Sequence, residues 1–413
     1  MSYRVVYPYI NHRSPQKNES LLSQRLTTPP CKMGATNSRS LCDANRQRSN
    51  TDSSSDYEDI TYSTEAMDRK ANCSYSCGVL VPDGRVVFAP HNARAVGVFN
   101  PATSEYSTIP GAPGNCAYSG GVLLNDGRVL FVPCCVTTIG IFDPATNAYS
   151  EIPDSSGKNF MYSGGVLLND GRVLFVPFYK TAFGIFDPKT NEHSTITGVH
   201  APCETAYKGG VLMGDGRVVL VPWNSKRIGI FDPKTNECTL VARSSPHNFA
   251  YSGGVLLDDG RVLFVPHIAR DIGIFDPATN KYSKIPGDPG RHFTYSGGVL
   301  LPDGRVVLVP YVKTDVGIFD PKTNEHSMIE SATGDISYPG GVLLADGRVI
   351  FVPSWNASHI GILTLSDEKA QRRARLRTEA VKQELIAAAW HPKRMTAWCL
   401  DTGERRELAE MGL

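Results

Sequence analysis

Residues 294–327 read TYSGGVLLPDGRVVLVPYVKTDVGIFDPKTNEHS, and most of the chain consists of copies of this stretch. The glycine before its Val-Leu pair recurs at spacings of 43, 44, 45, 44, 44 and 43 residues, at Gly78, Gly121, Gly165, Gly210, Gly254, Gly298 and Gly341. Seven copies at one period indicate a repeat architecture, in which each copy is one small structural unit.

Each copy contains four short runs typical of β-strands. In residues 294–327 and just beyond, they are GGVLL (297–301), RVVLV (305–309), VGIF (316–319) and EHSMI (325–329). The Asp-Gly pair between the first two is a hairpin signal that favours a type I′ turn. Four antiparallel strands per 44 residues are typical of a propeller blade. The sequence therefore predicts an all-β fold, a seven-bladed β-propeller of four-stranded antiparallel blades.

The seventh copy lacks a fourth strand, because it changes after Leu363 into residues 365–368, LSDE. A candidate replacement lies near the start of the chain, where Tyr62-Ser63-Thr64 resembles Tyr106-Ser107-Thr108 of the first copy. An unclosed ring would expose a sheet edge that can pair with other chains. We therefore expect residues 58–65 to complete blade seven, within a propeller that spans 58–365.

The two flanks of the propeller have different compositions. Residues 1–57 are rich in Ser, Asn, Arg and Gln, and such a segment buries too little apolar surface to order itself, so we expect disorder. Residues 366–413 begin with a capping serine, Ser366, and an acidic first turn, and carry apolar residues at helical spacing up to Pro392. They predict an α-helical tail.

Composition argues against several partners. The chain has 42 Lys and Arg against 41 Asp and Glu, so no charge excess favours nucleic acid, and no apolar run is long enough to cross a membrane. The N-terminus lacks the apolar core of a signal peptide. We expect an intracellular, cytoplasmic monomer, with the nucleus as the alternative because of the basic run at 369–377. The ten cysteines form no Cys-x-x-Cys pair and the histidines no ligand spacing, so we expect reduced thiols, no metal and no cofactor.

Two polar residues recur in every hairpin and are expected to be structural. The aspartate before the hairpin glycine, such as Asp83, is a turn residue. The arginine after it, such as Arg85, is expected to pair with the aspartate that ends the third strand of its own blade. Blades one and seven have Asn100 and Thr364 at that strand end, so the prediction is that they lack the ion pair.

A tyrosine precedes the first strand of every copy, at Tyr75, Tyr118, Tyr162, Tyr207, Tyr251, Tyr295 and Tyr338. Seven tyrosines at the innermost strands are predicted to form a ring around one mouth of the central channel. The alternative is that each packs between blades with its hydroxyl hydrogen-bonded.

Function is expected where the copies differ, on the face that carries the loops between strands two and three. The residues proposed to bind there are aromatic, cationic or histidine: His91, Arg94, Phe178, Tyr179, Lys180, Trp223, Lys226, Arg227, His267, Arg270, Tyr311, Lys313, Trp355 and His359. Aromatic residues beside cations are typical of binding hot spots. Six Lys or Arg against Asp271 and Asp315 in these loops favour an acidic protein partner.

The motifs GGVLLPDGRV and GIFDPKTN resemble the YVTN-type β-propeller repeat, and the streptogramin-lyase-like propellers share this layout. The resemblance spans roughly residues 70–365. It implies a propeller fold and says little about function, since the shared residues are turn and core residues.

The sequence leaves three functions open. The first is a non-enzymatic scaffold that binds a protein through the face carrying the loops between strands two and three, which we call the variable face. The fold alone cannot establish this function. The second is an enzyme, a lyase or hydrolase, at the channel mouth, with His247, His267 and His292 as candidate bases and Glu204, Asp271 and Asp315 as nearby acids. The third is a carbohydrate-binding propeller that stacks sugars on Trp223, Tyr311 and Trp355.

Overall fold

Strands are the regular elements of the computed structural model, which describes residues 60–67, 74–153, 162–179, 181–286, 295–311, 315–330, 337–354 and 359–365. All of these residues belong to one compact unit, Ser54–Leu413. Within them there is no helix long and apolar enough to span a membrane. The segment predicted to be disordered, 1–57, and the predicted helical tail, 366–413, lie outside the described residues.

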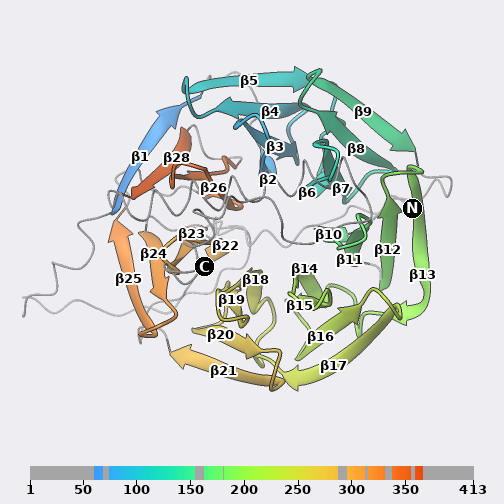
Figure 1. Ribbon diagram of the computed structural model, residues 1–413, viewed down its shortest axis with the longest axis vertical. Coiled ribbons are helices and arrows are strands. Elements are labelled where there is room, and N and C mark those ends of the chain that lie inside the picture. Colours follow the sequence, from blue (N-terminus) through green and yellow to red (C-terminus); the bar gives the residue numbers. More distant parts are fainter. Residues whose placement is uncertain are drawn as a thin grey trace, which may run out of the picture. The chain divides into compact units, whose positions relative to one another are not determined.

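The described strands form seven four-stranded antiparallel sheets, one per repeat, which confirms the predicted seven-bladed propeller (Figure 1). From blade one to blade seven, the innermost strands are β2 (Tyr75–Leu80), β6 (Tyr118–Leu123), β10 (Tyr162–Leu167), β14 (Tyr207–Leu212), β18 (Tyr251–Leu256), β22 (Tyr295–Leu300) and β26 (Gly341–Leu343). The second strands are β3 (Val86–Pro90), β7 (Val129–Pro133), β11 (Val173–Pro177), β15 (Val218–Pro222), β19 (Val262–Pro266), β23 (Val306–Pro310) and β27 (Val349–Phe351).

The third and fourth strands lie progressively further from the centre (Figure 1). The third strands are β4 (Ala95–Asn100), β8 (Thr138–Asp143), β12 (Ala182–Asp187), β16 (Arg227–Asp232), β20 (Asp271–Asp276), β24 (Asp315–Asp320) and β28 (His359–Leu365). The outermost strands are β5 (Glu105–Pro110), β9 (Ala148–Pro153), β13 (Glu192–His200), β17 (Glu237–Arg243), β21 (Lys281–Pro286), β25 (Glu325–Glu330) and β1 (Ile60–Ala66).

The hydrophobic core lies between the blades. Seven clusters of buried side chains each join two neighbouring blades, including blades seven and one. The second strands are buried on both faces, which explains why they read as continuous apolar runs such as Val129–Pro133. The outermost strands β5 and β9 contain only exposed and half-buried residues, because they cover the core from one side only.

The ring is closed by the N-terminal strand, as predicted. Strand β1 pairs antiparallel with β28 from Ile60↔Leu365 to Ala66↔His359 and so becomes the fourth strand of blade seven. Figure 1 shows β1 beside β28, at opposite ends of the colour scale. The Tyr62 hydroxyl hydrogen-bonds to the Tyr338 hydroxyl at 2.8 Å, and both side chains pack in the cluster between blades six and seven.

The hairpin turn is of a different type from the one predicted. In blade one the Gly84 amide donates to the Val81 carbonyl at 2.9 Å, and within the turn only Gly84 has a positive φ, of 90°. A type I′ turn needs positive φ at both central residues, and here these are Pro82 and Asp83. The turn is therefore type I followed by a left-handed glycine, and Pro82 pre-sets its first central residue.

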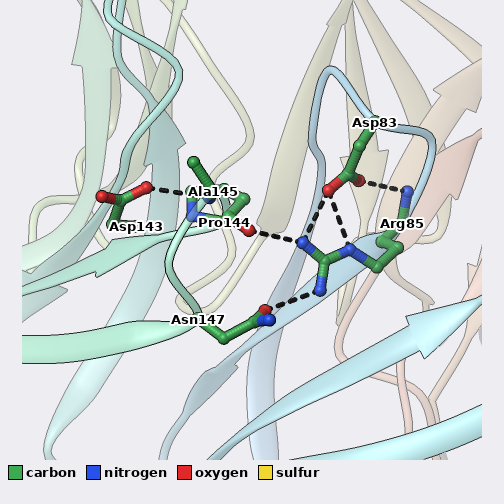
Figure 2. Close-up of polar contacts among 6 residues, drawn as sticks. All are labelled: Asp83, Arg85, Asp143, Pro144, Ala145 and Asn147. Carbon is green, nitrogen blue, oxygen red and sulfur yellow. Dashed lines mark hydrogen bonds and ion pairs between the residues drawn. The ribbon is translucent and has the colours of Figure 1, made fainter.

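The hairpin arginines pair with a different carboxylate from the one predicted. In all seven hairpins the guanidinium lies 2.6–2.8 Å from the aspartate two residues earlier, as in Arg85–Asp83 and, in blade seven, Arg348–Asp346. Blades one and seven, with Asn100 and Thr364 at the strand end, therefore carry the same hairpin ion pair as the other blades. The strand-end Asp143 instead accepts a hydrogen bond from the Ala145 amide at 2.9 Å, which stabilises its own turn (Figure 2).

The same arginines connect neighbouring blades. Arg85 of blade one donates to the Pro144 carbonyl at 2.6 Å and to Asn147 Oδ1 at 2.7 Å, both in blade two (Figure 2). Arg348 of blade seven donates to the Pro101 carbonyl of blade one at 3.0 Å, across the point where the ring closes. The hairpin arginine thus has a structural role between blades, whereas the sequence predicted a role within its own blade.

Candidate functional site

The seven repeat tyrosines are core residues and do not form an exposed ring at a channel mouth. Their side chains are 0–4 % exposed. Tyr75 illustrates the arrangement: it lies over Gly97 of the third strand, where an added Cβ would be 2.8 Å from its hydroxyl, and it hydrogen-bonds to Tyr106 of the fourth strand at 2.5 Å. The predicted ring was wrong because the third-strand glycine leaves room for the tyrosine inside its own blade. The alternative, packing between blades with a hydrogen-bonded hydroxyl, describes Tyr75 correctly, because Tyr75 also belongs to the core cluster between blades seven and one.

A cluster of aromatic and basic side chains comes from the residues that directly follow the second strands. Trp223, His267 and Tyr311 occupy this position in blades four, five and six. Their rings form a continuous series, with centroids 4.9 Å apart for Trp223–His267 and 5.4 Å for His267–Tyr311. All three were predicted to bind a ligand, and the structure brings them into contact.

Lys208, on the innermost strand of blade four, completes this cluster. Its Nζ lies 4.4 Å from the centroid of the Trp223 ring, the geometry of a cation–π interaction. We define Lys208, Trp223, His267 and Tyr311, together with His91, whose protonation the Lys208 charge disfavours, as the Lys208 cluster.

The backbone of blade four is irregular at this point. The register between β14 and β15 shifts from Tyr207 to Gly210, and Gly209 has φ 81°. In blades one, two, three, five and six the matching shift covers one residue fewer, as between Tyr162 and Gly164. A bulge of this kind re-aims a side chain. It gives Lys208 a backbone setting that differs from that of the equivalent serines.

The two histidines of the cluster are held by the next blade. His91 Nδ1 is 3.0 Å from the Tyr118 carbonyl, and His267 Nδ1 is 3.2 Å from the Tyr295 carbonyl. Because a carbonyl only accepts, Nδ1 carries the hydrogen in both rings, and the neutral form keeps a lone pair on Nε2.

Burial and the charge of Lys208 both disfavour protonation of these rings. Burial, and then Lys208, lower the pKa of His267 to about 4, and the same two causes lower the pKa of His91. His91 and His267 belong to blades one and five, yet the Lys208 ammonium influences both. Burial also lowers the pKa of Lys208 itself, to about 8. Among the described residues no carboxylate pairs with Lys208.

The Lys and Arg residues predicted to bind a partner, which we call the rim cations, differ in whether they form hydrogen bonds within the chain. Arg94 and Arg270 are exposed. Lys226 Nζ donates to Asn248 Oδ1 at 2.7 Å, and Arg227 Nη2 donates to the carbonyls of its own outer strand at 2.8 Å.

The other predicted binding residues are placed as follows. Phe178 and Tyr179 are half-buried and contact each other edge to face, 4.9 Å apart, and His359 begins β28. Lys180, Lys313 and Trp355 lie outside the described residues.

The candidate acids and bases of the enzymatic alternative differ in exposure and in their partners. His247 and Glu204 are exposed, and Asp271 pairs with Lys284 at 3.5 Å. Asp315 is half-buried at the start of β24, and His292 lies outside the described residues. Of these candidate acids and bases, His267 alone among the described residues belongs to the Lys208 cluster. In the part of the chain that the structure describes, no group of three or more His, Cys, Asp or Glu side chains could hold a metal.

Lys208 and Gly209 were missed by the sequence analysis, although the sequence holds a signal for Lys208. The position after the repeat tyrosine is serine in blades one, two, three, five and six, and lysine in blade four. A charged residue that replaces a small one on an innermost strand could have been singled out by comparing the copies.

Comparisons with known proteins identify the fold. No family model matches the chain, and no curated protein is similar to it in sequence. Among solved structures, a catalytically inactive variant of virginiamycin B lyase from Staphylococcus aureus with quinupristin matches with a TM-score of 0.64 and 14% identity over 74% of this chain and 99% of that one. A streptogramin B lyase matches with a TM-score of 0.63 and 17% identity over 74% of this chain and 98% of that one. An extracellular domain from B. thetaiotaomicron matches with a TM-score of 0.57 and 11% identity over 73% of this chain and 42% of that one.

The chain has the fold of a streptogramin-lyase-like seven-bladed propeller. At identities this low the likeness concerns the fold alone, because propellers of one architecture carry unrelated functions.

Proposed function

We propose that this protein is a non-catalytic binding protein that accepts a carboxylate group of an acidic protein partner beside Lys208. The observation that carries the proposal is the Lys208 ammonium, which lies 4.4 Å from the Trp223 centroid and has no carboxylate partner among the described residues. Lys208 is half-buried, and a cation that is partly withdrawn from water carries a cost that an opposite charge would compensate.

The surroundings of Lys208 fit an anionic group. The Trp223 ring offsets only part of the desolvation cost, since a cation–π interaction contributes about 0.5–2 kcal/mol. A carboxylate that accepts a hydrogen bond from the ammonium would offset more, because charge-assisted hydrogen bonds are roughly twice as strong as neutral ones. The Trp223, His267 and Tyr311 rings would contact the apolar part of the group that carries the carboxylate.

The rim of the same face supports an acidic partner. Arg94 and Arg270 are exposed and available to a negatively charged surface. Rim charges of this kind mainly increase the rate of association and select against wrong partners. Lys226 and Arg227 are engaged within the chain, so we expect them to contribute less.

The proposal is tested by capturing partners from a cell extract and identifying them by mass spectrometry. Three baits are compared: the wild type, Lys208→Ser, and a variant in which Lys180, Lys226, Arg227, Arg270 and Lys313 are changed to Glu. Serine is the residue of five other blades at this position, so Lys208→Ser should fold. We expect a partner that is lost from both variants and is displaced from the wild type by glutarate. A partner set that is retained by Lys208→Ser and insensitive to glutarate would refute the proposal.

A second candidate is an enzyme that acts at the Lys208 cluster. The neutral His91 and His267 rings, each with its Nδ1 hydrogen fixed by a carbonyl, have the form required of a general base at Nε2. The fold is also that of a virginiamycin B lyase, an inactive variant of which is described with quinupristin. Incubation with quinupristin, followed by mass spectrometry, separates the two candidates. Turnover that disappears in His267→Ala would favour the enzyme, and intact quinupristin is the result we expect.

A further inference from the structure

Blade two carries two adjacent cysteines where blades four to six carry aromatic or histidine residues. Cys134 directly follows β7, in the position that Trp223 and His267 occupy in their blades, and Cys135 follows it. The two Sγ atoms are 3.9 Å apart, which is van der Waals contact between thiols. Both residues are reduced thiols; Cys134 is 3 % exposed and Cys135 is half-buried.

The local backbone holds this pair in place. The Cys134 amide donates to the Ala117 carbonyl at 2.8 Å, and the Cys135 amide donates to the Cys116 carbonyl at 3.2 Å. Cys116 itself is fixed by Asn92, whose side-chain oxygen accepts from the Cys116 amide at 2.9 Å. The two thiols therefore meet in a loop with defined geometry, at the edge of the variable face.

Tyr179 of blade three is coupled electrostatically to the same thiols. Burial raises the pKa of the Tyr179 phenol, and Cys134, Cys135 and Cys116 raise it further. Tyr179 also contacts Phe178, which follows β11 as Cys134 follows β7. Oxidation of the thiol pair would thus change the electrostatic surroundings of Tyr179, a predicted binding residue.

We propose that Cys134 and Cys135 are an oxidation site, at which a peroxide converts the two thiols into a disulfide between adjacent residues. The half-buried Cys135 Sγ attacks the peroxide, its S–O bond forms as the O–O bond breaks, and the products are a sulfenic acid and water or an alcohol. The Cys134 Sγ then attacks the Cys135 sulfur, the S–O bond breaks, and water leaves. The peroxide is reduced by two electrons and the two thiols are oxidised by two.

The difference in exposure assigns the roles of the two residues. Cys135 is reachable from solvent and reacts first, whereas Cys134 is too buried to meet the oxidant and is already in contact with its partner. A resolving thiol at contact distance prevents further oxidation to the sulfinic acid. Cys203 is an exposed thiol and serves as an internal comparison.

The test exposes the purified, reduced full-length protein to hydrogen peroxide, blocks remaining thiols with N-ethylmaleimide, and maps peptides by mass spectrometry. We expect the 134–135 peptide to lose two hydrogen atoms, to resist the blocking reagent and to regain reactivity after dithiothreitol. Cys203 should instead gain oxygen or stay alkylatable. In Cys134→Ser, Cys135 should accumulate sulfinic acid.

Two results would overturn the proposal. The first is Cys135 carrying two or three oxygen atoms in the wild type while Cys134 remains alkylatable. The second is a disulfide from Cys135 to Cys116 in place of Cys134. Both are read from the wild type alone, so the test does not depend on whether a variant folds.

Discussion

Tyr118 and Tyr207 occupy the same position in blades two and four, but their hydroxyls have different surroundings. The Tyr118 hydroxyl bonds to the Tyr149 hydroxyl at 2.6 Å, whereas the buried Tyr207 hydroxyl has no hydrogen-bond partner among the described residues. Blade four has Cys238 on its fourth strand where blade two has Tyr149, which accounts for the difference.

We therefore expect Tyr118→Phe and Tyr207→Phe to have different effects on stability. Removal of the bonded Tyr118 hydroxyl should lower the free energy of unfolding by about 1 kcal/mol, and removal of the unbonded Tyr207 hydroxyl should leave it unchanged or raise it. Urea unfolding of both variants measures the difference. Equal losses would mean that the Tyr207 hydroxyl is satisfied in solution.

Lys208 gives a pH-dependent prediction. Its pKa is about 8 in the folded chain, because of burial, and about 10.4 in an unfolded chain. Between these values the unfolded chain binds more protons, so at this site stability rises with pH across the window. Relative to Lys208→Ser, the wild type should gain roughly 1–3 kcal/mol of unfolding free energy from pH of about 7 to about 10.5.

The comparison with Lys208→Ser removes the contribution of the titrating groups that Lys208 does not influence; His91 and His267, whose pKa values it lowers, titrate below this pH window in the wild type. Chemical unfolding at several pH values, without added carboxylates, gives the two stability curves. A difference that does not change with pH would mean that the lysine keeps its ordinary pKa and is fully hydrated.

At the scale of single residues, the sequence indicated which residues lie at the candidate site better than it indicated which residues they contact. The variable residues Trp223, His267 and Tyr311 were identified because they differ between copies, and they do cluster. The contact between Trp223 and Lys208 could not be predicted, because Lys208 lies in a β-bulge for which the sequence contains no recognisable signal. The exposure of the tyrosines was misjudged because burial depends on a glycine about twenty residues later, in another strand.

Among the elements, the hairpin offers the clearest comparison between prediction and structure. Its position and its Asp-Gly pair were correctly recognised in all seven blades, but its turn type was not. The information was present in Pro82 and Pro302, since proline cannot adopt the positive φ of a type I′ turn. The arginine partner was also misjudged, because the aspartate two residues away competes with the more distant strand end.

The turn type predicts the effect of a proline in blade seven. Ala345 occupies the position of Pro82, is exposed, and its turn keeps the Gly347–Leu344 hydrogen bond at 3.1 Å. Ala345→Pro should raise the free energy of unfolding by about 0.4–1 kcal/mol by restricting the unfolded chain. Gly347→Ala is the matched contrast and should be destabilising, because Gly347 has φ 89°. A strongly destabilised Ala345→Pro would contradict the type I assignment, and thermal unfolding measures both variants.

For the whole molecule, the decisive feature is that the ring is joined at one place by strands from opposite ends of the described chain. Strand β1 contributes the outer edge of blade seven, and the clusters on either side of that blade include Ile60 and Met67. The repeat period predicted seven blades, and the missing fourth strand of the last copy predicted where closure would occur. Both predictions succeeded because they rest on counting copies and on the likeness of residues 62–64 to 106–108, which require no knowledge of side-chain contacts.

Deletion of residues 1–66 should open the ring, whereas deletion of residues 1–50 should not. The longer deletion removes the partner of β28 and buried apolar area from Ile60 and Tyr62, roughly 3–5 kcal/mol of stabilisation, so the melting temperature should fall by about 10 °C. It also exposes β28 as an edge strand that can pair with a second molecule. Thermal unfolding and light scattering on both truncations measure the two effects. If the truncations melt alike and stay monomeric, β1 does not hold the ring closed, and the seven inter-blade clusters alone must stabilise it.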